Sequence, residues 1–196
     1  MTMRQWIMAA LAALGLSVAG STDERDTPHG GIDPENLLYI DLPHGRVVIE
    51  MYPDKAPQHV KRIKTLARQG FYDGIIFHRV IPGFMAQTGD PEGTGQGGSA
   101  LPDLPAEFND MMHLRGTVSM ARTNKPDSAN SQFFIMFQPN PSLDGKYTVW
   151  GRVLEGMRHV DKIAKGEPPA DPTRMERVSV AADVLAQDDS SEGDGD

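Results

Sequence analysis

The sequence predicts a mostly β protein whose antiparallel sheet closes on itself or forms a sandwich, accompanied by two helices. Seven or eight short segments are rich in β-forming residues, only two segments have helical spacing, and strands and helices do not alternate. The 20 Gly and 15 Pro residues fit such a turn-rich chain. With 196 residues the chain has room for one ordinary domain and its ends, and we expect that domain at residues 37–185.

The first predicted elements are a hairpin and a helix. Residues 37–42 and 46–51 are β-rich runs separated by Pro43-His44-Gly45. Residues 56–69 place apolar side chains three and four positions apart, and Gly70 ends this helix. Turn residues then separate the remaining candidates, which are strands at 75–80, 116–121, 132–137, 148–153 and 175–184 and a second helix at 157–164.

The two ends of the chain differ in composition from the part between them. In residues 1–19, Arg4 precedes an apolar run that ends in Ser17-Val18-Ala19, the pattern of a cleaved signal peptide. The run is shorter than the roughly 20 residues that span a bilayer, so we expect export without stable membrane insertion. Residues 20–36 predict a polar linker, and residues 186–196 predict a disordered acidic tail.

Composition argues against several classes of function. The net charge is −8 and no basic stripe offsets it, so nucleic acid is not an expected partner. The absence of cysteine excludes disulfides and thiolate catalysis. The six histidines have no ligand spacing, and residues 93–98 lack the Lys-Ser/Thr of a phosphate loop. We therefore expect no metal and no cofactor.

Residues 77–87 have the most specific composition in the chain. They join a β-run that contains Arg79 to a tight Pro82-Gly83 turn, which Phe84, Met85 and Gln87 follow. Residues 132–135 form another alternating run with amide and aromatic side chains. Such a set is suited to lining a shallow apolar pocket with a few hydrogen-bond donors.

Four motifs in one order resemble those of the cyclophilins, a family of peptidyl-prolyl cis-trans isomerases. They are residues 77–87 (FHRVIPGFMAQ), 119–122 (SMAR), 131–135 (SQFFI) and 143–146 (LDGK). Several linked motifs are more specific than one short motif, and the resemblance covers residues 37–185. It implies an eight-stranded antiparallel closed β-barrel capped by two α-helices, proline-containing polypeptides as substrates, and a role in protein folding.

The resemblance also implies roles for individual residues. Arg79 matches the catalytic arginine, and the matched substrate-binding residues are Phe84, Met85, Gln87, Ala121, Arg122, Gln132, Phe134, Leu143 and Tyr147. Gly93-Thr94-Gly95 resembles the glycine-rich loop at the groove edge. Ser142 stands where many members carry Trp, so we expect weak cyclosporin binding, and Tyr147 stands where they carry His.

The expected chemistry needs no covalent intermediate. Amide resonance opposes rotation about an X-Pro bond with a barrier of about 18–20 kcal/mol. A fixed guanidinium can donate to the prolyl nitrogen, which regains a lone pair in the twisted state. Arg79 is therefore the expected essential group.

Other interpretations remain open from the residues. A domain of the same fold that only binds proline peptides, as a module or holdase, is the main alternative, whereas a hydrolase lacks a Gly-x-Ser-x-Gly setting. His78 should face away from Arg79, as a hydrogen-bonded, partly buried side chain. Asp103, Glu107 and Asp110 are predicted to be solvated loop charges. We expect a periplasmic monomer.

Overall fold

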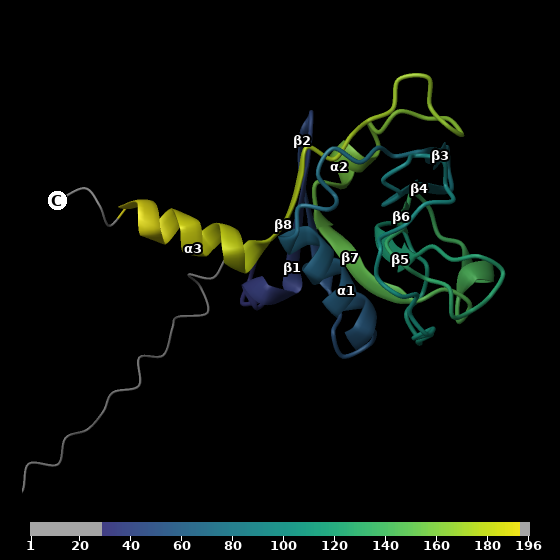
Figure 1. Ribbon diagram of the computed structural model, residues 1–196, viewed down its shortest axis with the longest axis horizontal. Coiled ribbons are helices and arrows are strands. Elements are labelled where there is room, and N and C mark those ends of the chain that lie inside the picture. Colours follow the sequence, from purple (N-terminus) through teal and green to yellow (C-terminus); the bar gives the residue numbers. More distant parts are fainter. Residues whose placement is uncertain (1–28, 193–196) are drawn as a thin grey trace, which may run out of the picture. The chain divides into compact units, whose positions relative to one another are not determined.

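The computed structural model describes residues 29–192 (Figure 1). The predicted signal peptide at residues 1–19 lies outside the described residues, as does the linker up to residue 28. The chain divides after Gly31, and the unit that starts at Ile32 contains the predicted domain. Among the helices described, none has the length and apolar character needed to cross a membrane.

Eight strands form one antiparallel sheet in the order β3-β4-β6-β5-β7-β2-β1-β8. The strands are β1 (Leu37–Leu42), β2 (Gly45–Met51), β3 (Arg79–Ile81), β4 (Met85–Thr88), β5 (Thr117–Met120), β6 (Phe133–Met136), β7 (Val149–Glu155) and β8 (Arg177–Val180). The predicted hairpin β1–β2 is present, and β4, which was not predicted as a strand, continues the motif after the Pro82-Gly83 turn.

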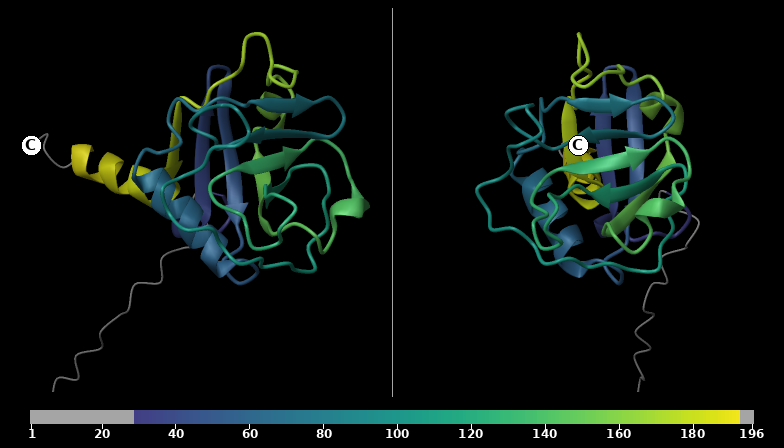
Figure 2. Two further views of the ribbon diagram at one scale, coloured as in Figure 1. Left: turned by 45° about the vertical axis from the view of Figure 1, so that its right-hand side comes forward. Right: turned by 90° about the vertical axis from the view of Figure 1, so that its right-hand side faces the viewer.

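The sheet is a curled, open half-barrel, so the predicted closed barrel is wrong (Figure 2). Its edge strands β3 and β8 are only three and four residues long and do not pair with each other. Irregular segments that precede them meet instead: Met175 N–H donates to Ile75 O at 2.9 Å, and Phe77 N–H donates to Thr173 O at 2.9 Å. A few isolated hydrogen bonds take the place of a continuous ladder between the two edges of the sheet. For the same reason, only the end of the strand predicted at 75–80 is a regular strand.

Helix α1 (Pro57–Arg68) buries the apolar face that the sequence predicts, with Val60, Ile63 and Leu66 in the core. Ala56 gives its N-terminus no side-chain cap. Glu107 supplies the cap from a distant loop, because its carboxylate accepts the Gln58 N–H at 3.0 Å and the His59 N–H at 3.1 Å. The prediction that Glu107 is solvated is therefore wrong.

The C-terminal region differs most from the prediction. Strand β8 ends at Val180, and α3 (Ala181–Glu192) occupies residues where the sequence predicted the end of a strand and a disordered tail. The Ala- and Leu-containing start of this segment favours a helix. Helix α2 (Met157–Val160) is present but shorter than predicted, and α1 and α2 lie at different ends of the curled sheet (Figure 2).

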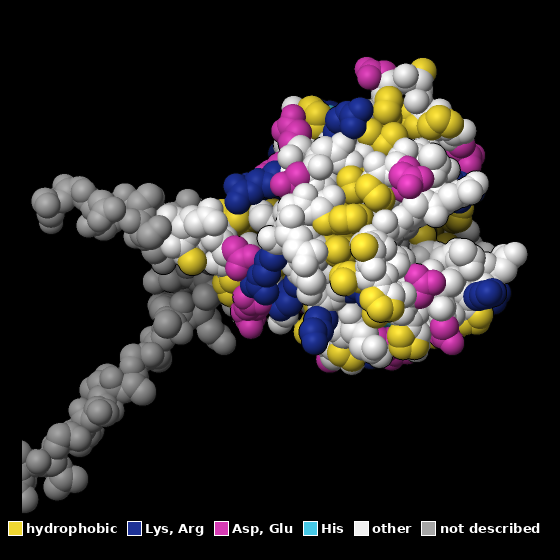
Figure 3. Space-filling model, in the orientation of Figure 1, with side chains coloured by type: hydrophobic (Ala, Val, Ile, Leu, Met, Phe, Trp, Pro, Cys, Tyr) yellow, Lys and Arg dark blue, Asp and Glu magenta, His cyan; other side chains and the backbone are white. Residues whose placement is uncertain are grey.

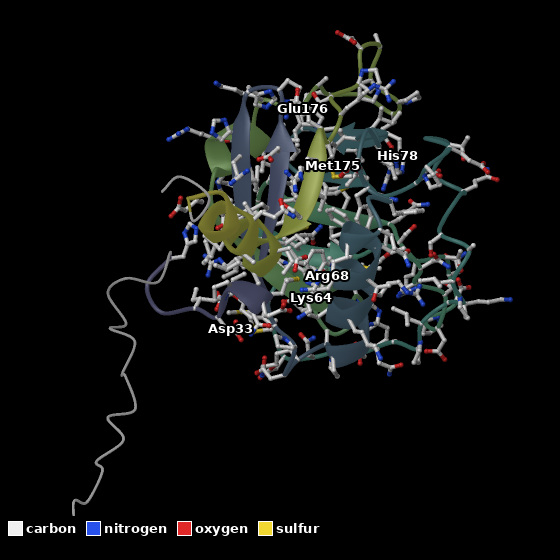
Figure 4. All side chains as sticks on the ribbon, turned by 60° about the vertical axis from the view of Figure 1, so that its left-hand side comes forward. Asp33, Lys64, Arg68, His78, Met175 and Glu176 are labelled. Atoms are coloured by element: carbon white, nitrogen blue, oxygen red, sulfur yellow. The ribbon has the colours of Figure 1, made fainter. Side chains whose placement is uncertain are left out.

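Charged residues connect α3 to α1 and to the 3-10 helix η1 (Pro34–Asn36), which lies in the predicted linker. Arg68 pairs with Asp183 at 2.9 Å and with Glu35 at 2.6 Å, and Glu35 also pairs with Lys64 at 2.7 Å. Acidic and basic side chains lie together at the base of α3 in Figure 3, and Figure 4 labels Lys64 and Arg68 on α1. These partly exposed pairs lie between segments from the two ends of the domain.

Strand β6 separates the core from a second apolar cluster. Phe133 and Ile135 point into the main core, where Phe133 meets the rings of Tyr72 and Trp150 edge to face at 5.7 and 5.5 Å. Because side chains alternate along a strand, Phe134 and Met136 point to the other face and form a separate cluster with Met85. That second cluster is the base of the candidate site.

Candidate active site

A pocket of about 460 Å³ lies over the second apolar cluster. All but one of the residues predicted from the sequence line it: Arg79, Phe84, Met85, Gln87, Ala121, Arg122, Phe134, Leu143 and Tyr147. Gly93-Thr94-Gly95, which the sequence predicted at the groove edge, also lines it. Residues far apart in the sequence therefore meet at one concave surface.

The floor and one wall of the pocket are apolar. Met85 and Phe134 are buried, and the ring of Tyr147 meets that of Phe134 edge to face at 5.6 Å. The positions follow from the β3–β4 turn, where Gly83 has a φ of 71°, a conformation that favours glycine. After the turn, β4 pairs with β6, so that Met85 lies opposite Met136 and Gln87 lies opposite Phe134.

The opposite wall is polar. Arg79 on β3 lies directly opposite Gln87 on β4. The Gln87 Nε2 donates to Gln132 Oε1 at 2.9 Å, and the Gln132 Nε2 donates to the carbonyl oxygens of Gly95 and Gly97 at 3.1 and 2.8 Å. Gln132 is the predicted residue that does not line the pocket. It lines an adjacent depression of about 560 Å³, which shares Gln87, Gly95, Ala121 and Arg122 with the pocket.

The glycine-rich loop is folded around one carboxylate. Asp90 is buried and accepts hydrogen bonds from the backbone N–H groups of Glu92, Thr94, Gly95 and Gly97. Burial is the largest single influence on the pKa of Asp90 and acts to raise it. The hydrogen bonds together outweigh burial, so the pKa of Asp90 lies below its ordinary value. The loop edge of the pocket is therefore fixed by an ionised side chain.

Arg122 serves the rim of the pocket rather than its interior. Its Nε and Nη2 donate to the Lys146 carbonyl oxygen at 3.1 and 2.7 Å, and its guanidinium lies 4.6 Å from the centre of the Tyr147 ring. The same contacts orient Tyr147 at the rim of the pocket. The Ala121 N–H donates to Gln132 O at 2.9 Å.

His78 lines the pocket, so the prediction that it faces away as a hydrogen-bonded residue is wrong. His78 is only 5% exposed, and neither of its ring nitrogens has a hydrogen-bond partner among the described residues. Burial lowers its pKa and favours the neutral ring. The sequence placed His78 on a regular strand, but β3 begins only at Arg79, and the preceding residues turn the ring toward the glycine-rich loop. Figure 4 labels His78 away from Lys64 and Arg68.

Glu167 and Pro168 also line the pocket and were not predicted. Arg79 Nε donates to Glu167 Oε2 at 2.7 Å, across 88 positions of sequence. Residues 165–173 follow α2 as an irregular segment, in which no helical or strand periodicity marks a functional residue. Sequence reasoning had no signal that connects this segment to β3.

Three residues beneath the pocket have the connectivity of a Ser-His-Asp triad. His113 Nδ1 lies 2.8 Å from Asp144 Oδ1, and His113 Nε2 lies 2.9 Å from Ser119 Oγ. However, Ser119 is fully buried, and the His113 ring stacks on Phe134 with a centroid distance of 6.2 Å. A nucleophile needs access to its substrate, so this network supports the pocket floor and does not attack substrate.

Comparison with known proteins agrees with this geometry. The family model for cyclophilin type peptidyl-prolyl cis-trans isomerase matches residues 37–181. A probable peptidyl-prolyl cis-trans isomerase of Brucella suis biovar 1 is 47% identical over 195 residues, which cover 91% of this chain and 98% of that protein. Peptidyl-prolyl cis-trans isomerase-like 1 of Aspergillus fumigatus is 39% identical over 154 residues, which cover 73% of this chain and 94% of that protein.

Solved structures show the same fold. A crystal structure of a cyclophilin from Hirschia baltica superimposes with a TM-score of 0.73 at 33% identity, covering 78% of this chain and 76% of that one. A Cryptosporidium parvum cyclophilin type isomerase, crystallised in the presence of the dipeptide Ala-Pro, gives a TM-score of 0.69 at 29% identity, covering 74% and 98%.

The residues that match the family model include all eight strands and the residues that line the pocket. Together with the similar enzymes, this match defines the molecule as an enzyme, a peptidyl-prolyl cis-trans isomerase. The chain belongs to the cyclophilin family.

Proposed function

We propose that this enzyme accelerates rotation about X-Pro bonds in exported polypeptides by non-covalent stabilisation of the twisted imide. The observation that carries the proposal is the position of Arg79, a permanently charged group at the polar wall of an apolar pocket. Within residues 29–192, Nη1 and Nη2 of Arg79 have no hydrogen-bond partner. They are therefore available to a substrate.

The residue types fit the two demands of the reaction. The floor formed by Met85 and Phe134 holds the proline ring by apolar contact, with Phe84, Leu143 and Tyr147 around it. Rotation breaks amide resonance and returns a lone pair to the prolyl nitrogen. A donor from Arg79 to that nitrogen is strong only in the twisted state, so it lowers the barrier instead of tightening ground-state binding.

The peptide backbone on either side of the proline needs polar partners. We assign this role to Gln87 and to the adjacent depression, where Gln132, Ala121 and Arg122 lie. The proline dipeptide present with the Cryptosporidium relative supports a proline-containing ligand for the shared fold. A groove that reads proline and main chain accepts many sequences, as a folding catalyst requires.

Exchange spectroscopy on a short proline peptide tests turnover against simple binding. With the enzyme at a small fraction of the peptide concentration, we expect cis and trans signals to exchange far faster than in the uncatalysed reaction, which takes tens of seconds or more. Peptide resonances that shift on addition of the protein without faster exchange would contradict the proposal and support a holdase.

Ser142 leads us to propose weak cyclosporin binding. It lies on the 3-10 helix η2 (Pro141–Leu143), exposed, with its hydroxyl donating to Asn140 Oδ1 at 2.7 Å. A serine offers neither the flat apolar surface nor the indole donor of the tryptophan that many relatives carry there. Calorimetric titration should give weak binding for the wild type and at least about tenfold tighter binding for Ser142→Trp. Nanomolar binding by the wild type would contradict the proposal.

We also propose that the mature enzyme is a periplasmic monomer that assists the folding of exported chains. The signal-peptide pattern of residues 1–19 supports this proposal. Mass spectrometry of the protein from cell fractions should find a periplasmic chain that begins near Gly20, and light scattering should give a single-chain mass. A cytoplasmic, uncleaved chain would contradict export.

A further inference from the structure

We propose that Glu167 is a positioning residue for isomerisation, whose carboxylate fixes the Arg79 guanidinium and leaves Nη1 and Nη2 to the substrate. The proposal rests on the function proposed for Arg79. It starts from the 2.7 Å hydrogen bond between Arg79 Nε and Glu167 Oε2 at the edge of the pocket.

The backbone dictates that these two side chains meet. Val80 and Gly166 form an isolated antiparallel bridge and exchange both of their hydrogen bonds, at 2.8 and 2.9 Å. One step along each segment, Arg79 then lies opposite Glu167. Side chains that are directly opposite in an antiparallel pair project to the same face. The 165–173 segment therefore extends the edge of β3 and brings a carboxylate to the pocket.

Among the described residues, Glu167 is the hydrogen-bond partner of the Arg79 side chain. Gln87, which lies opposite Arg79 on the other side of β3, has its amide donating to Gln132 instead. The lining of this pocket contains two arginines, Arg79 and Arg122, and one acidic residue, Glu167. Its loss would leave the guanidinium free to rotate about the torsions of a long side chain.

The exposure of the pair favours a role in catalysis over one in folding. The side chains of Arg79 and Glu167 are 42% and 51% exposed. An ion pair at that exposure contributes little to folding, because water and salt screen it. By contrast, a donor held in place before the reaction loses less entropy when the imide twists, and small errors in its placement slow the reaction strongly.

Gly166 shows how tightly the segment is held. Its φ is +145°, and a Cβ there would lie 2.7 Å from Pro169 Cα and 2.9 Å from Pro168 O. A side chain at this position would push the following residues apart. The register between residue 166 and Val80, and with it the position of Glu167, thus depends on a glycine that the sequence supplies.

The test compares Glu167→Gln and Glu167→Asp with the matched control Glu35→Gln. Glu35 is similarly exposed (41%) and pairs with Arg68 at 2.6 Å, but it does not line the pocket. With a proline peptide, we expect Glu167→Gln to lower kcat about tenfold with KM changed by less than about twofold. Glu167→Asp should recover part of the loss because it keeps the charge, and Glu35→Gln should match the wild type.

A spectroscopic arm reports on the contact itself. The Nε–H signal of Arg79, assigned by its loss in Arg79→Lys, should shift and exchange faster with water in Glu167→Gln, and should not change in Glu35→Gln. Wild-type kcat in Glu167→Gln would overturn the proposal whatever the Nε–H signal does, as would a fall in kcat with that signal unchanged. A wild type that fails to catalyse exchange would refute the proposed function, and the Nε–H signal would still decide whether Glu167 holds Arg79.

Discussion

The side chain of Arg79 receives its position from two neighbours of different kinds. Across β3–β4 it faces Gln87, and at the edge of β3 it meets Glu167. The motif from Phe77 to Gln87 predicted the first neighbour, because both members lie within a few residues of one turn. No sequence pattern predicted the second, since an ion pair between a strand and a distant irregular segment leaves no periodic trace.

His78 and Glu107 show the same limit of sequence reasoning. The sequence predicts which face of a regular strand or helix a residue occupies, but His78 precedes β3 and Glu107 lies in a loop. Their partners and burial are set by tertiary packing, which turns His78 into the pocket and places Glu107 at the N-terminus of α1. Both residues were therefore mispredicted for the same physical reason.

The buried His59–Glu107 pair predicts how stability depends on pH. Burial lowers the pKa of His59, and its Nδ1 donates to the carboxylate of Glu107 at 2.6 Å. In the unfolded chain His59 takes up a proton near its ordinary pKa of about 6.5, whereas the folded chain resists it. The unfolded state thus binds more protons below that pH, and stability falls as pH falls.

Urea unfolding at pH 7.0 and 5.5 measures this effect. We expect the free energy of unfolding to drop by about 1 kcal/mol from this histidine alone. His59→Asn keeps an N–H donor for Glu107 but cannot titrate, so its unfolding free energy should depend less steeply on pH, whatever its absolute stability. An unchanged slope in the variant would contradict the assignment.

Among the elements, β4 and β6 determine the floor of the pocket. Their register brings Met85 opposite Met136, and the alternation along β6 sends Phe133 to the core and Phe134 to the site. The sequence predicted β6 and grouped residues that line one pocket, because alternation and motif order are local signals. It missed β4, which is only four residues long, and predicted a strand where α3 begins.

The 165–173 segment gives a prediction at the scale of an element. Gly166→Ala keeps Glu167 in the chain but forces the backbone to move, since the added Cβ would lie 2.7 Å from Pro169 Cα. We expect stability to fall by about 1–3 kcal/mol and kcat to fall about fivefold at a temperature where the variant is folded. Circular dichroism and the peptide exchange assay measure the two effects. A folded variant with wild-type kcat would show that the segment does not contribute to catalysis.

At the scale of the whole molecule, the curled sheet has two apolar faces with different uses. The inner face and helices α1 and α2 form the main core, and the outer side of β4 and β6 carries the pocket. The resemblance implied the number of strands correctly, but the closed barrel was not correct, because closure depends on how irregular segments beside β3 and β8 meet. The site uses the β3-β4-β6-β5 part of the sheet, and the 165–173 segment pairs with the edge strand β3 beside it.

In the proposed mechanism, turnover depends on one charged group, Arg79, at the wall of an apolar pocket. Exchange spectroscopy with wild type, Arg79→Lys and Arg79→Ala on one proline peptide tests this most directly, with peptide binding followed by chemical shift in the same samples. We predict that Arg79→Ala still binds the peptide and folds, yet loses about 100-fold or more of kcat, with Arg79→Lys between the two. An Arg79→Ala enzyme that binds the peptide and exchanges it at the wild-type rate would contradict the account.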